Sequence, residues 1–196
     1  MKLVALASGG KDSTYAAYLA SKAGHKIVCL LSIMSTPESY MYHYPNIHMM
    51  PLVSRAWGLP LILHHTTEED ELKELEKSLS LLKVDGVCTG AVASVYQKSR
   101  IEKIASKLGL ETISPLWGCE PEETLLKMVD EMDVMIVRVA AEGLGKEWLG
   151  KVLDEETAHE LIRVCKKYGI HPLGEGGEYE TFVLYAPHFK KRIKIS

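Results

Sequence analysis

The stretch Ala7-Ser8-Gly9-Gly10-Lys11-Asp12-Ser13, close to the start of the chain, decides the fold. Residues 3–7 (LVALA) form an apolar run that predicts a buried strand leading into it, and residues 14–23 form a helical pattern that ends at Gly24. The glycines between strand and helix let the backbone approach a phosphate closely, and the first N–H groups of the helix point toward it. The sequence therefore predicts an anion site at this corner.

The polar residues of this stretch fit an anion site with one exception. Lys11 adds a full positive charge, and Ser8 and Ser13 offer hydroxyl groups. Asp12 is the exception, because a carboxylate beside phosphates is unfavourable unless it caps the helix or helps to hold Mg²⁺. A strand–helix corner without a ligand is the alternative interpretation for two glycines alone, but the complete hexapeptide is more specific.

The hexapeptide Ser8–Ser13 (SGGKDS) resembles the PP-loop of ATP pyrophosphatases, enzymes that cleave ATP between the α and β phosphates. It differs from the Walker A loop, which places four residues between its glycines and ends in Gly-Lys-Ser/Thr. The resemblance implies ATP binding by the whole stretch, with Asp12 also as a ligand of Mg²⁺. The residues so implied are Ala7, Ser8, Gly9, Gly10, Lys11, Asp12 and Ser13.

The chain continues as a repeated strand–helix pattern. Residues 26–33 (KIVCLLSI) predict a second buried strand, and such β-α-β crossovers imply a parallel sheet covered by helices. Ligands of these sheets lie beyond the C-terminal ends of the strands, which is where the Gly9-Gly10 turn lies. Further strands of this sheet are predicted at residues 61–65, 84–89 and 112–114.

Other residues are predicted to border a nucleotide by the same rule. Ile33 ends the second strand, Gly90 follows the fourth strand, and Gln97 and Arg100 lie at the N-terminal end of the next helix. A solvated polar face is the alternative interpretation for Gln97 and Arg100. Their place beside the phosphate loop favours a nucleotide or substrate role.

The pattern changes around residues 115–121, where prolines and a Leu-Trp-Gly segment interrupt it. We therefore predict an ATP-binding domain over residues 1–117 and a smaller α/β domain, for substrate or ammonia, over residues 118–196. The smaller domain is predicted to contain helices at 121–132 and 154–168, strands at 134–140 and 182–185, and a last strand at 191–195 that pairs with its predecessor.

Residues 35–48 (STPESYMYHYPNIH) form an aromatic loop with little periodicity. Aromatic packing over a helix and a substrate lid at the active edge of the sheet are equally good interpretations. The second makes Tyr42 and His43 candidate substrate contacts. A metal site at His43 and His48 is not favoured, because no carboxylate or cysteine completes the set of ligands.

Residues 174–182 (GEGGEYETF) are the second informative stretch. Three glycines let the chain approach a ligand, and three carboxylates share one turn. Such crowding is unfavourable unless a cation, an ammonium group or a bound donor offsets it. A plain acidic hairpin is the alternative interpretation. The combination favours a ligand site made of Glu175, Gly176, Gly177, Glu178, Glu180 and Thr181.

The composition is that of a globular protein with a substantial core. The 196 residues are 46% hydrophobic and 25% charged, and the formal net charge of -3 argues against dedicated nucleic-acid binding. The 4 cysteines form no CxxC pair, so neither a zinc site nor a thiol relay is predicted. Because no apolar run approaches the ~18 residues of a membrane span and no signal peptide precedes the first strand, we expect a cytoplasmic protein without a membrane partner.

Four motifs occur in one order along the chain: SGGKDS (8–13), GAVASVYQKSRIE (90–102), PLW (115–117) and GEGGEYETF (174–182). Together they resemble the diphthine–ammonia ligase family, a family of PP-loop ATP pyrophosphatases. The resemblance covers nearly the whole chain. It implies an adenine-nucleotide α-hydrolase fold, which is a Rossmann-like α/β fold with a parallel sheet, up to about residue 115, followed by a smaller α/β domain.

The resemblance also implies the last step of diphthamide synthesis. Diphthine on translation elongation factor 2 would be adenylated by ATP, with Mg²⁺, and ammonia would displace AMP to leave the amide. Lys11 and Asp12 would act on the phosphates, and Glu175 and Glu178 would be catalytic residues of the second domain. The carboxylates of this turn, Glu180 included, could hold ammonium, deprotonate it or bind the trimethylammonium of diphthine, and the sequence leaves these three roles open.

Two other functions are open at this point. Another PP-loop enzyme, such as a tRNA-modifying one, needs a sulfur-carrying cysteine or a basic RNA-binding surface, and the sequence signals neither. A sensor module would bind ATP without chemistry. The sequence also leaves open whether the chain forms a homo-oligomer.

Overall fold

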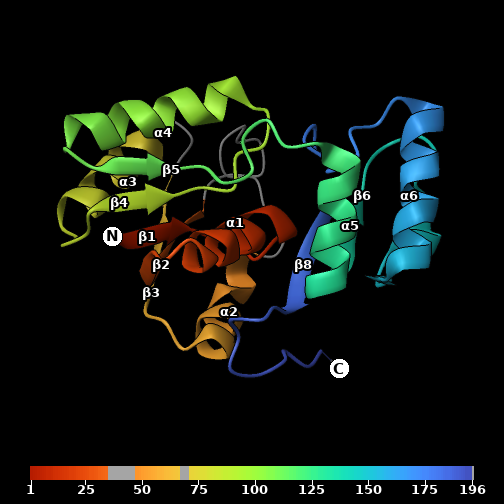
Figure 1. Ribbon diagram of the computed structural model, residues 1–196, viewed down its shortest axis with the longest axis horizontal. Coiled ribbons are helices and arrows are strands. Elements are labelled where there is room, and N and C mark those ends of the chain that lie inside the picture. The colour runs from red at the N-terminus through yellow and green to blue at the C-terminus, as the bar shows by residue number, and fades with distance from the viewer. Residues whose placement is uncertain (35–46, 67–70, 196) are drawn as a thin grey trace.

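The computed structural model describes residues 1–34, 47–66 and 71–195, and these form an α/β architecture with two sheets (Figure 1). The predicted substrate contacts Tyr42 and His43 lie outside the described residues. Among the residues that the structure describes, no helix is long and apolar enough to cross a membrane.

The first sheet confirms the predicted parallel arrangement. Its strands are all parallel in the order β3-β2-β1-β4-β5, so the direction in which strands are added reverses between β1 and β4. Sheets of this kind bind ligands at such a reversal, beyond the C-terminal ends of the strands. The strands are β1 (Lys2–Leu6), β2 (Lys26–Met34), β3 (Leu61–His65), β4 (Gly86–Cys88) and β5 (Glu111–Ile113).

Helices connect these strands as the sequence pattern predicts (Figure 1). Helix α1 begins at Lys11, directly after the two glycines and earlier than the predicted start at residue 14. Pro51 lies in the first turn of α2, where its fixed backbone angle suits a helix start. The helices are α1 (Lys11–Lys22), the 3-10 helix η1 (Ile47–Met49), α2 (Met50–Trp57), α3 (Glu71–Ser80) and α4 (Val95–Lys107).

The two faces of the first sheet belong to two different cores. On one face, Val4 and Val87 pack with apolar side chains of α3 and α4. On the other face, Leu3 joins a larger core that continues into the C-terminal part of the chain and includes Leu125 and Phe182. The first sheet and the C-terminal part are therefore joined by continuous apolar packing.

The C-terminal part is a smaller α/β unit, as predicted, but its sheet is antiparallel. Its strands lie in the order β7-β6-β8, and the helices α5 and α6 pack against each other and against this sheet (Figure 1). The proposed division between residues 117 and 118 stays a prediction. The elements are α5 (Pro121–Glu131), β6 (Asp133–Val139), the 3-10 helix η3 (Lys146–Trp148), β7 (Val152–Leu153), α6 (Glu155–Tyr168) and β8 (Tyr179–Tyr185).

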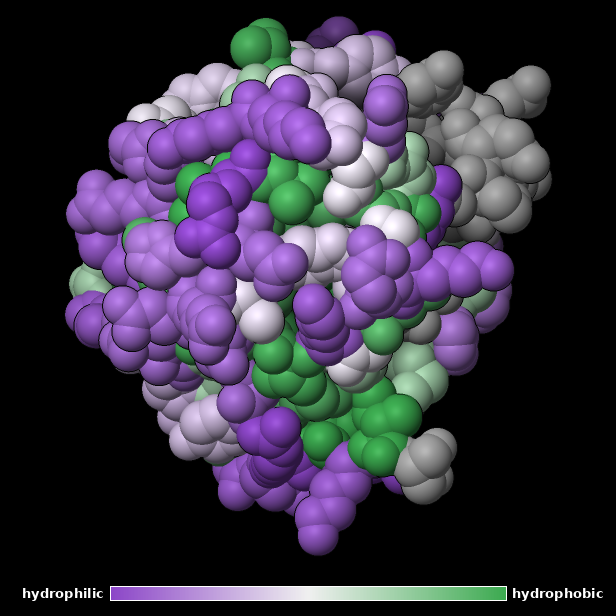
Figure 2. Space-filling model, turned by 90° about the vertical axis from the view of Figure 1, so that its right-hand side faces the viewer, coloured by the Kyte–Doolittle hydropathy of each residue, from purple (hydrophilic) through white to green (hydrophobic). Residues whose placement is uncertain are grey.

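The outer surface of this smaller unit is mostly polar. Figure 2 shows the face that carries α6, where hydrophilic side chains cover most of the surface and hydrophobic side chains gather mainly in the lower half of the view. Asp154 caps α6 as predicted, because its side chain accepts the N–H of Thr157 while the Thr157 hydroxyl accepts the N–H of Asp154.

The prediction of a last strand at residues 191–195 is wrong. One backbone hydrogen bond, from the N–H of Ile193 to the carbonyl of Leu184, links this segment to β8, and no strand forms there. The segment is instead anchored by burial of Phe189 and Ile193, and the N–H of Lys190 donates to the carbonyl of Ala56 in α2. The short strand β7, which the sequence did not signal, occupies an edge of the second sheet.

An aromatic cluster fastens the C-terminal segment to α1 and α2. The ring of His188 lies 4.0 Å from that of Trp57, 5.7 Å from that of Tyr18 and 5.1 Å from that of Phe189, measured between centroids. Both ring nitrogens of His188 are buried and have no hydrogen-bond partner within the described ranges. This burial lowers the pKa of His188 from 6.5 to about 4.

We expect the lowered pKa of His188 to make the protein less stable in mild acid. The unfolded chain takes up this proton near pH 6.5 and the folded chain only near pH 4, so the free energy of unfolding falls as pH falls between these values. The loss attributable to His188 is about 3 kcal/mol at the lower limit. Urea unfolding from pH 7.5 to pH 4.5 measures it. His188→Phe should flatten the profile and His159→Gln, on the exposed face of α6, should not; equal profiles for wild type and His188→Phe would refute the assignment.

Candidate active site

Strand β8 of the second sheet forms hydrogen bonds with the phosphate loop. The N–H of Val183 in β8 donates to the carbonyl of Gly9 at 2.9 Å, and the N–H of Lys11 donates to the hydroxyl of Thr181 at 3.1 Å. Gly9 has a φ of +81°, which side chains rarely adopt, and a Cβ there would lie 3.1 Å from the Phe182 ring. The loop therefore needs glycine at this position for conformation and for packing.

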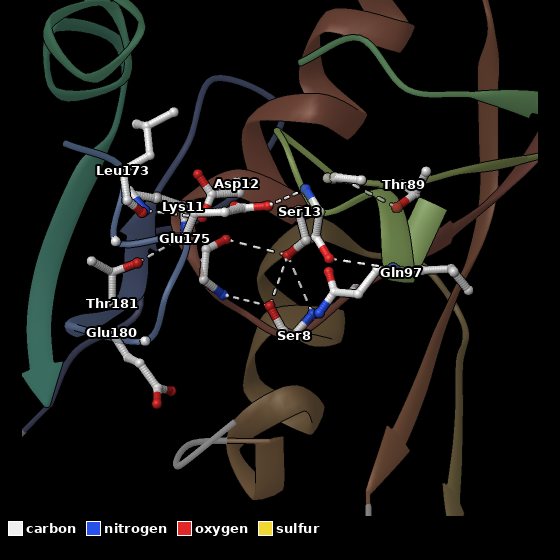
Figure 3. Close-up of a pocket in the computed structure, with 18 of the residues that line it drawn as sticks. Ser8, Lys11, Asp12, Ser13, Thr89, Gln97, Leu173, Glu175, Glu180 and Thr181 are labelled. Carbon is white, nitrogen blue, oxygen red and sulfur yellow. Dashed lines mark hydrogen bonds and ion pairs between the residues drawn. The ribbon is translucent and has the colours of Figure 1, made fainter. Parts of the chain in front are cut away.

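The hydroxyl groups of two serines form hydrogen bonds within the loop. The hydroxyl groups of Ser8 and Ser13 lie 3.1 Å apart, and the Ser13 hydroxyl accepts the N–H of Ser8 at 3.2 Å (Figure 3). The Ser8 hydroxyl accepts the N–H of Gly10 at 3.3 Å. In the described part of the chain, the N–H groups of Asp12 and Ser13 at the start of α1 have no acceptor. Such free N–H groups at a helix N-terminus favour an anion.

Lys11 points from the loop toward the second sheet's unit rather than into solvent (Figure 3). Its side chain is buried, and Nζ donates to the carbonyl of Leu173 at 2.5 Å and to Oδ2 of Asp12 at 2.9 Å. The ammonium group also lies 5.1 Å from the ring centroid of Tyr179, whose hydroxyl donates to the carbonyl of Pro172. Burial raises the pKa of Tyr179 well above 10, so this ring stays neutral beside the lysine.

The two carboxylate oxygens of Asp12 differ in their hydrogen bonding. Oδ2 accepts from Lys11, whereas Oδ1 is buried without a hydrogen-bond partner among the described residues. A buried oxygen without a donor fits the predicted Mg²⁺ ligand. No group of three His, Cys, Asp or Glu side chains arranged for a metal occurs in the described ranges. A magnesium ion held by Asp12 would therefore take most of its other ligands from phosphates and water.

The loop opens into a cavity of about 1020 Å³ that both parts of the chain line. One wall is apolar and contains Ile33 from the end of β2 and Ile101 from α4. Tyr96 and Gln97 from the first turn of α4 also line the cavity, and Ser94 caps that helix by accepting the N–H of Gln97. The cavity thus places an apolar wall beside a loop whose N–H groups favour an anion.

The three glutamates of residues 174–182 each have their own hydrogen-bond or ion-pair donors. Glu175 accepts the N–H groups of Ala93 and Ser94 at 3.1 and 3.0 Å, so it reaches across to the start of α4. Glu178 accepts the N–H of Gly176 at 2.8 Å, and Glu180 forms an ion pair with Arg138 at 2.6 Å. The structure therefore offsets the predicted crowding of charge by distributing it among separate donors.

The structure brings most of the predicted site residues together around one cavity. Gly9 faces the second sheet instead of the cavity, and Arg100 lies outside it, stacked on Tyr96 at 3.3 Å from the ring centroid. Their predicted contacts with a nucleotide stay predictions. The predicted residues that line the cavity are Ala7, Ser8, Gly10, Lys11, Asp12, Ser13, Ile33, Gly90, Gln97, Glu175, Gly176, Gly177, Glu178, Glu180 and Thr181.

Gly90 lines the cavity, but the packing around it also requires a glycine at this position. A Cβ at this position would lie 2.6 Å from the backbone nitrogen of Ser13 and 2.8 Å from the carbonyl carbon of Asp12. The end of β4 therefore packs directly on the first turn of α1. This contact fixes the helix start against the sheet, and only a residue without a side chain allows it.

Sequence reasoning missed Arg138 and the carbonyl of Leu173. Arg138 stands alone as a charged residue in the otherwise apolar stretch 134–140, and such an exception near a strand end was a usable signal. The role of Leu173 rests on its backbone oxygen, which no sequence pattern reveals.

The fold and the cavity define an α/β protein with a PP-type phosphate loop at the reversal of a parallel sheet. Residues 1–112 match the diphthamide synthase N-terminal domain, and residues 120–196 match the diphthamide synthase C-terminal domain. The whole chain is 38% identical to a diphthine–ammonia ligase of Homo sapiens and 34% identical to one of Schizosaccharomyces pombe, and it covers 83% and 36% of those proteins. The chain belongs to the diphthine–ammonia ligase family.

A solved structure shares the fold. It is the crystal structure of a predicted subunit of tRNA methyltransferase from Methanocaldococcus jannaschii, with a TM-score of 0.53, 16% identity, and coverage of 98% of this chain and 100% of that one. At this identity the likeness concerns the fold alone, and it agrees with the predicted α/β class.

We expect Gly90→Ala to destabilise the protein in the absence of any ligand. The added Cβ meets backbone, which cannot move aside as a side chain does, so the free energy of unfolding should fall by about 1–3 kcal/mol. Gly145→Ala is the matched control, because the atoms nearest to its Cβ would be those at the flexible end of the exposed Glu147 side chain. Urea unfolding measures both. Equal stability of the two variants would mean that Gly90 serves only a ligand.

Proposed function

We propose that the chain amidates diphthine on translation elongation factor 2, with ATP and ammonia as co-substrates and AMP and pyrophosphate as products. One observation carries this proposal: a phosphate loop and an acidic glycine-rich turn, far apart in sequence, line the same cavity. Family membership over the whole chain supports it. A cytoplasmic location follows from the acceptor, because elongation factor 2 works in translation.

The first step activates a carboxylate, which is a poor acceptor for an amine because it would have to expel oxide. One carboxylate oxygen of diphthine attacks the α-phosphorus, the bond to the β-phosphate oxygen breaks, and pyrophosphate leaves. The free N–H groups of Asp12 and Ser13 and the ammonium of Lys11 stabilise the charge that develops on the phosphates. Mg²⁺, bound through Oδ1 of Asp12, would neutralise charge on the phosphates and the leaving pyrophosphate.

The second step forms the amide. Ammonia attacks the acyl carbon, a carbon–nitrogen bond forms, and the bond to AMP breaks. The nitrogen sheds a proton, and Glu178 or Glu175 is within the cavity to receive it or to hold ammonium beforehand. No side chain forms a covalent bond with the substrate in this scheme.

A tRNA-modifying activity is the second candidate, and it is suggested by a shared fold alone. The solved structure that shares the fold is described as a predicted tRNA methyltransferase subunit. Its 16% identity supports only the fold, whereas the identity of 38% to a diphthine–ammonia ligase extends over the whole chain. The net charge of -3 also disfavours an RNA-binding surface. Incubation with ATP, ammonium and either diphthine-bearing elongation factor or tRNA separates the two.

We expect Lys11→Ala to lower the rate of AMP formation by roughly 10²–10³, the effect of losing one preorganised charged group. The change also leaves the carbonyl of Leu173 without its donor, at a cost of about 1–3 kcal/mol in stability, so the assay belongs well below the unfolding temperature. Lys22→Ala, in the last turn of the same helix, is the control and should keep the wild-type rate. An unchanged rate in Lys11→Ala would refute the role of the loop.

We expect Glu175→Gln and Glu178→Gln to keep ATP binding and to lose at least roughly tenfold in amide formation, because each loses a charge that attracts a cation. If these carboxylates serve ammonia, raising the ammonium concentration rescues the variants; if they hold the diphthine cation, raising elongation factor does so. Amide formation is followed by the mass of the modified peptide, with Glu142→Gln in an exposed loop as the control. Wild-type rates in both variants would make the turn purely structural.

A further inference from the structure

The cavity is rich in negative charge and poor in positive charge. Among its described lining residues, the carboxylates are Asp12, Glu175, Glu178 and Glu180, whereas the only cationic side chains are Lys11 and Arg138. Lys11 is buried and bonded to Leu173 and Asp12 beside the phosphate loop. Of the described lining residues, Arg138 is therefore the one remaining cation for an anionic group of a second ligand.

Arg138 lies where such a group can reach it. It is opposite Glu180 in the register of β6 and β8, and its Nη1 donates to Oε1 of Glu180 at 2.6 Å. The Arg138 side chain is 41% exposed and that of Glu180 14%. Within residues 1–34, 47–66 and 71–195, the other guanidinium nitrogens of Arg138 have no acceptor. Because a guanidinium has five N–H donors in a planar fork, one edge can donate to Glu180 while another donates to a second carboxylate.

We propose that the Arg138–Glu180 pair recognises the zwitterion of the acceptor: Arg138 binds the carboxylate of diphthine, and Glu180 binds its trimethylammonium group. This inference rests on the proposed function and names the residues that would select its substrate. A trimethylammonium group donates no hydrogen bond, so it is recognised by charge and apolar contact. A carboxylate is bound well by two parallel N–H donors such as those of a guanidinium group. The pair presents both, side by side, on the wall formed by the second sheet.

The chemistry of the first step also calls for a cation at this place. The diphthine carboxylate must approach the triphosphate, and two anions repel each other in a cavity with few cations. Arg138 offsets this repulsion by holding one carboxylate oxygen while the other attacks the α-phosphorus. Figure 3 shows Glu180 at the edge of the group of loop residues, next to Thr181, whose hydroxyl contacts the loop. The proposed acceptor subsite thus adjoins the loop without occupying it.

A purely structural role is the alternative, since opposite charges across two strands stabilise a sheet by about 0.2–1 kcal/mol. The two roles make opposite predictions for a charge swap. The double variant with Arg138→Glu and Glu180→Arg restores the ion pair but reverses its direction. A purely structural ion pair would stabilise the sheet with the two charges in either order. A pair that binds the zwitterion of the acceptor would lose binding when the charges are exchanged.

The test measures amide formation at varied concentrations of diphthine-bearing elongation factor, with ATP and ammonium saturating. We expect Arg138→Met to raise the KM for elongation factor roughly 10- to 100-fold, as for the loss of a charged hydrogen-bond partner, and to leave the affinity for ATP unchanged. Arg138→Lys should recover part of this loss. The charge swap should stay as impaired as Arg138→Met. The equivalent swap of the ion pair between Arg192 and Asp133, outside the cavity, should keep wild-type kinetics.

The outcomes separate the two proposals. If the wild-type chain forms no amide, the proposed function fails and this inference falls with it. If the wild type forms the amide and Arg138→Met keeps its KM, only the role of the pair is overturned. Recovery of the wild-type KM in the charge swap overturns it equally, because it shows that the pair acts within the sheet. If Arg138→Met does not fold, the soluble Arg138→Lys and charge-swap variants decide the question.

Discussion

The contact on which the rest of the structure depends is that between β8 and the phosphate loop. The N–H of Val183 bonds to the carbonyl of Gly9, and the hydroxyl of Thr181 accepts the N–H of Lys11. The ammonium of Lys11 adds a bond to the carbonyl of Leu173, which precedes β8 in the chain. A phosphate loop usually takes its shape from its own strand and helix. Here the second sheet supplies part of that support, so the loop and the acidic turn are positioned by the same strand.

This contact explains why the two parts of the chain share a core. Leu3 of the first sheet and Phe182 of β8 belong to one continuous apolar cluster, and the Phe182 ring packs beneath Gly9. The shared core places the ends of both sheets around one cavity. The two-step reaction proposed above needs this placement, because the activated acyl group must meet its second substrate where it was formed.

The sequence was sufficient for most of the elements, with β7 and the predicted last strand as exceptions, and insufficient for the contacts between them. The apolar run before Gly9, the glycines and the helix after them predict β1, the loop and α1, because each rests on interactions within a few residues. The partner of the Lys11 ammonium is 162 residues away, and its identity as a backbone carbonyl leaves no trace in residue type. The predicted last strand failed for a similar reason. Ile193 and Ile195 alternate with charges as in a strand, but the segment is held by burial of Phe189 and Ile193 against a helix and a core that only the fold brings there.

The buried state of Lys11 is compatible with a role on the phosphates. An ammonium group has three N–H donors, and Lys11 gives one to Leu173 and one to Asp12. The third has no acceptor among the described residues, so under the proposed function a phosphate would add to the existing arrangement instead of competing with it. The carbonyl of Leu173 would then orient the charge in advance, and burial away from water would strengthen its attraction for the anion. A lysine that is fixed before the substrate arrives loses little side-chain freedom on binding, which is the physical advantage of anchoring the loop to the second sheet.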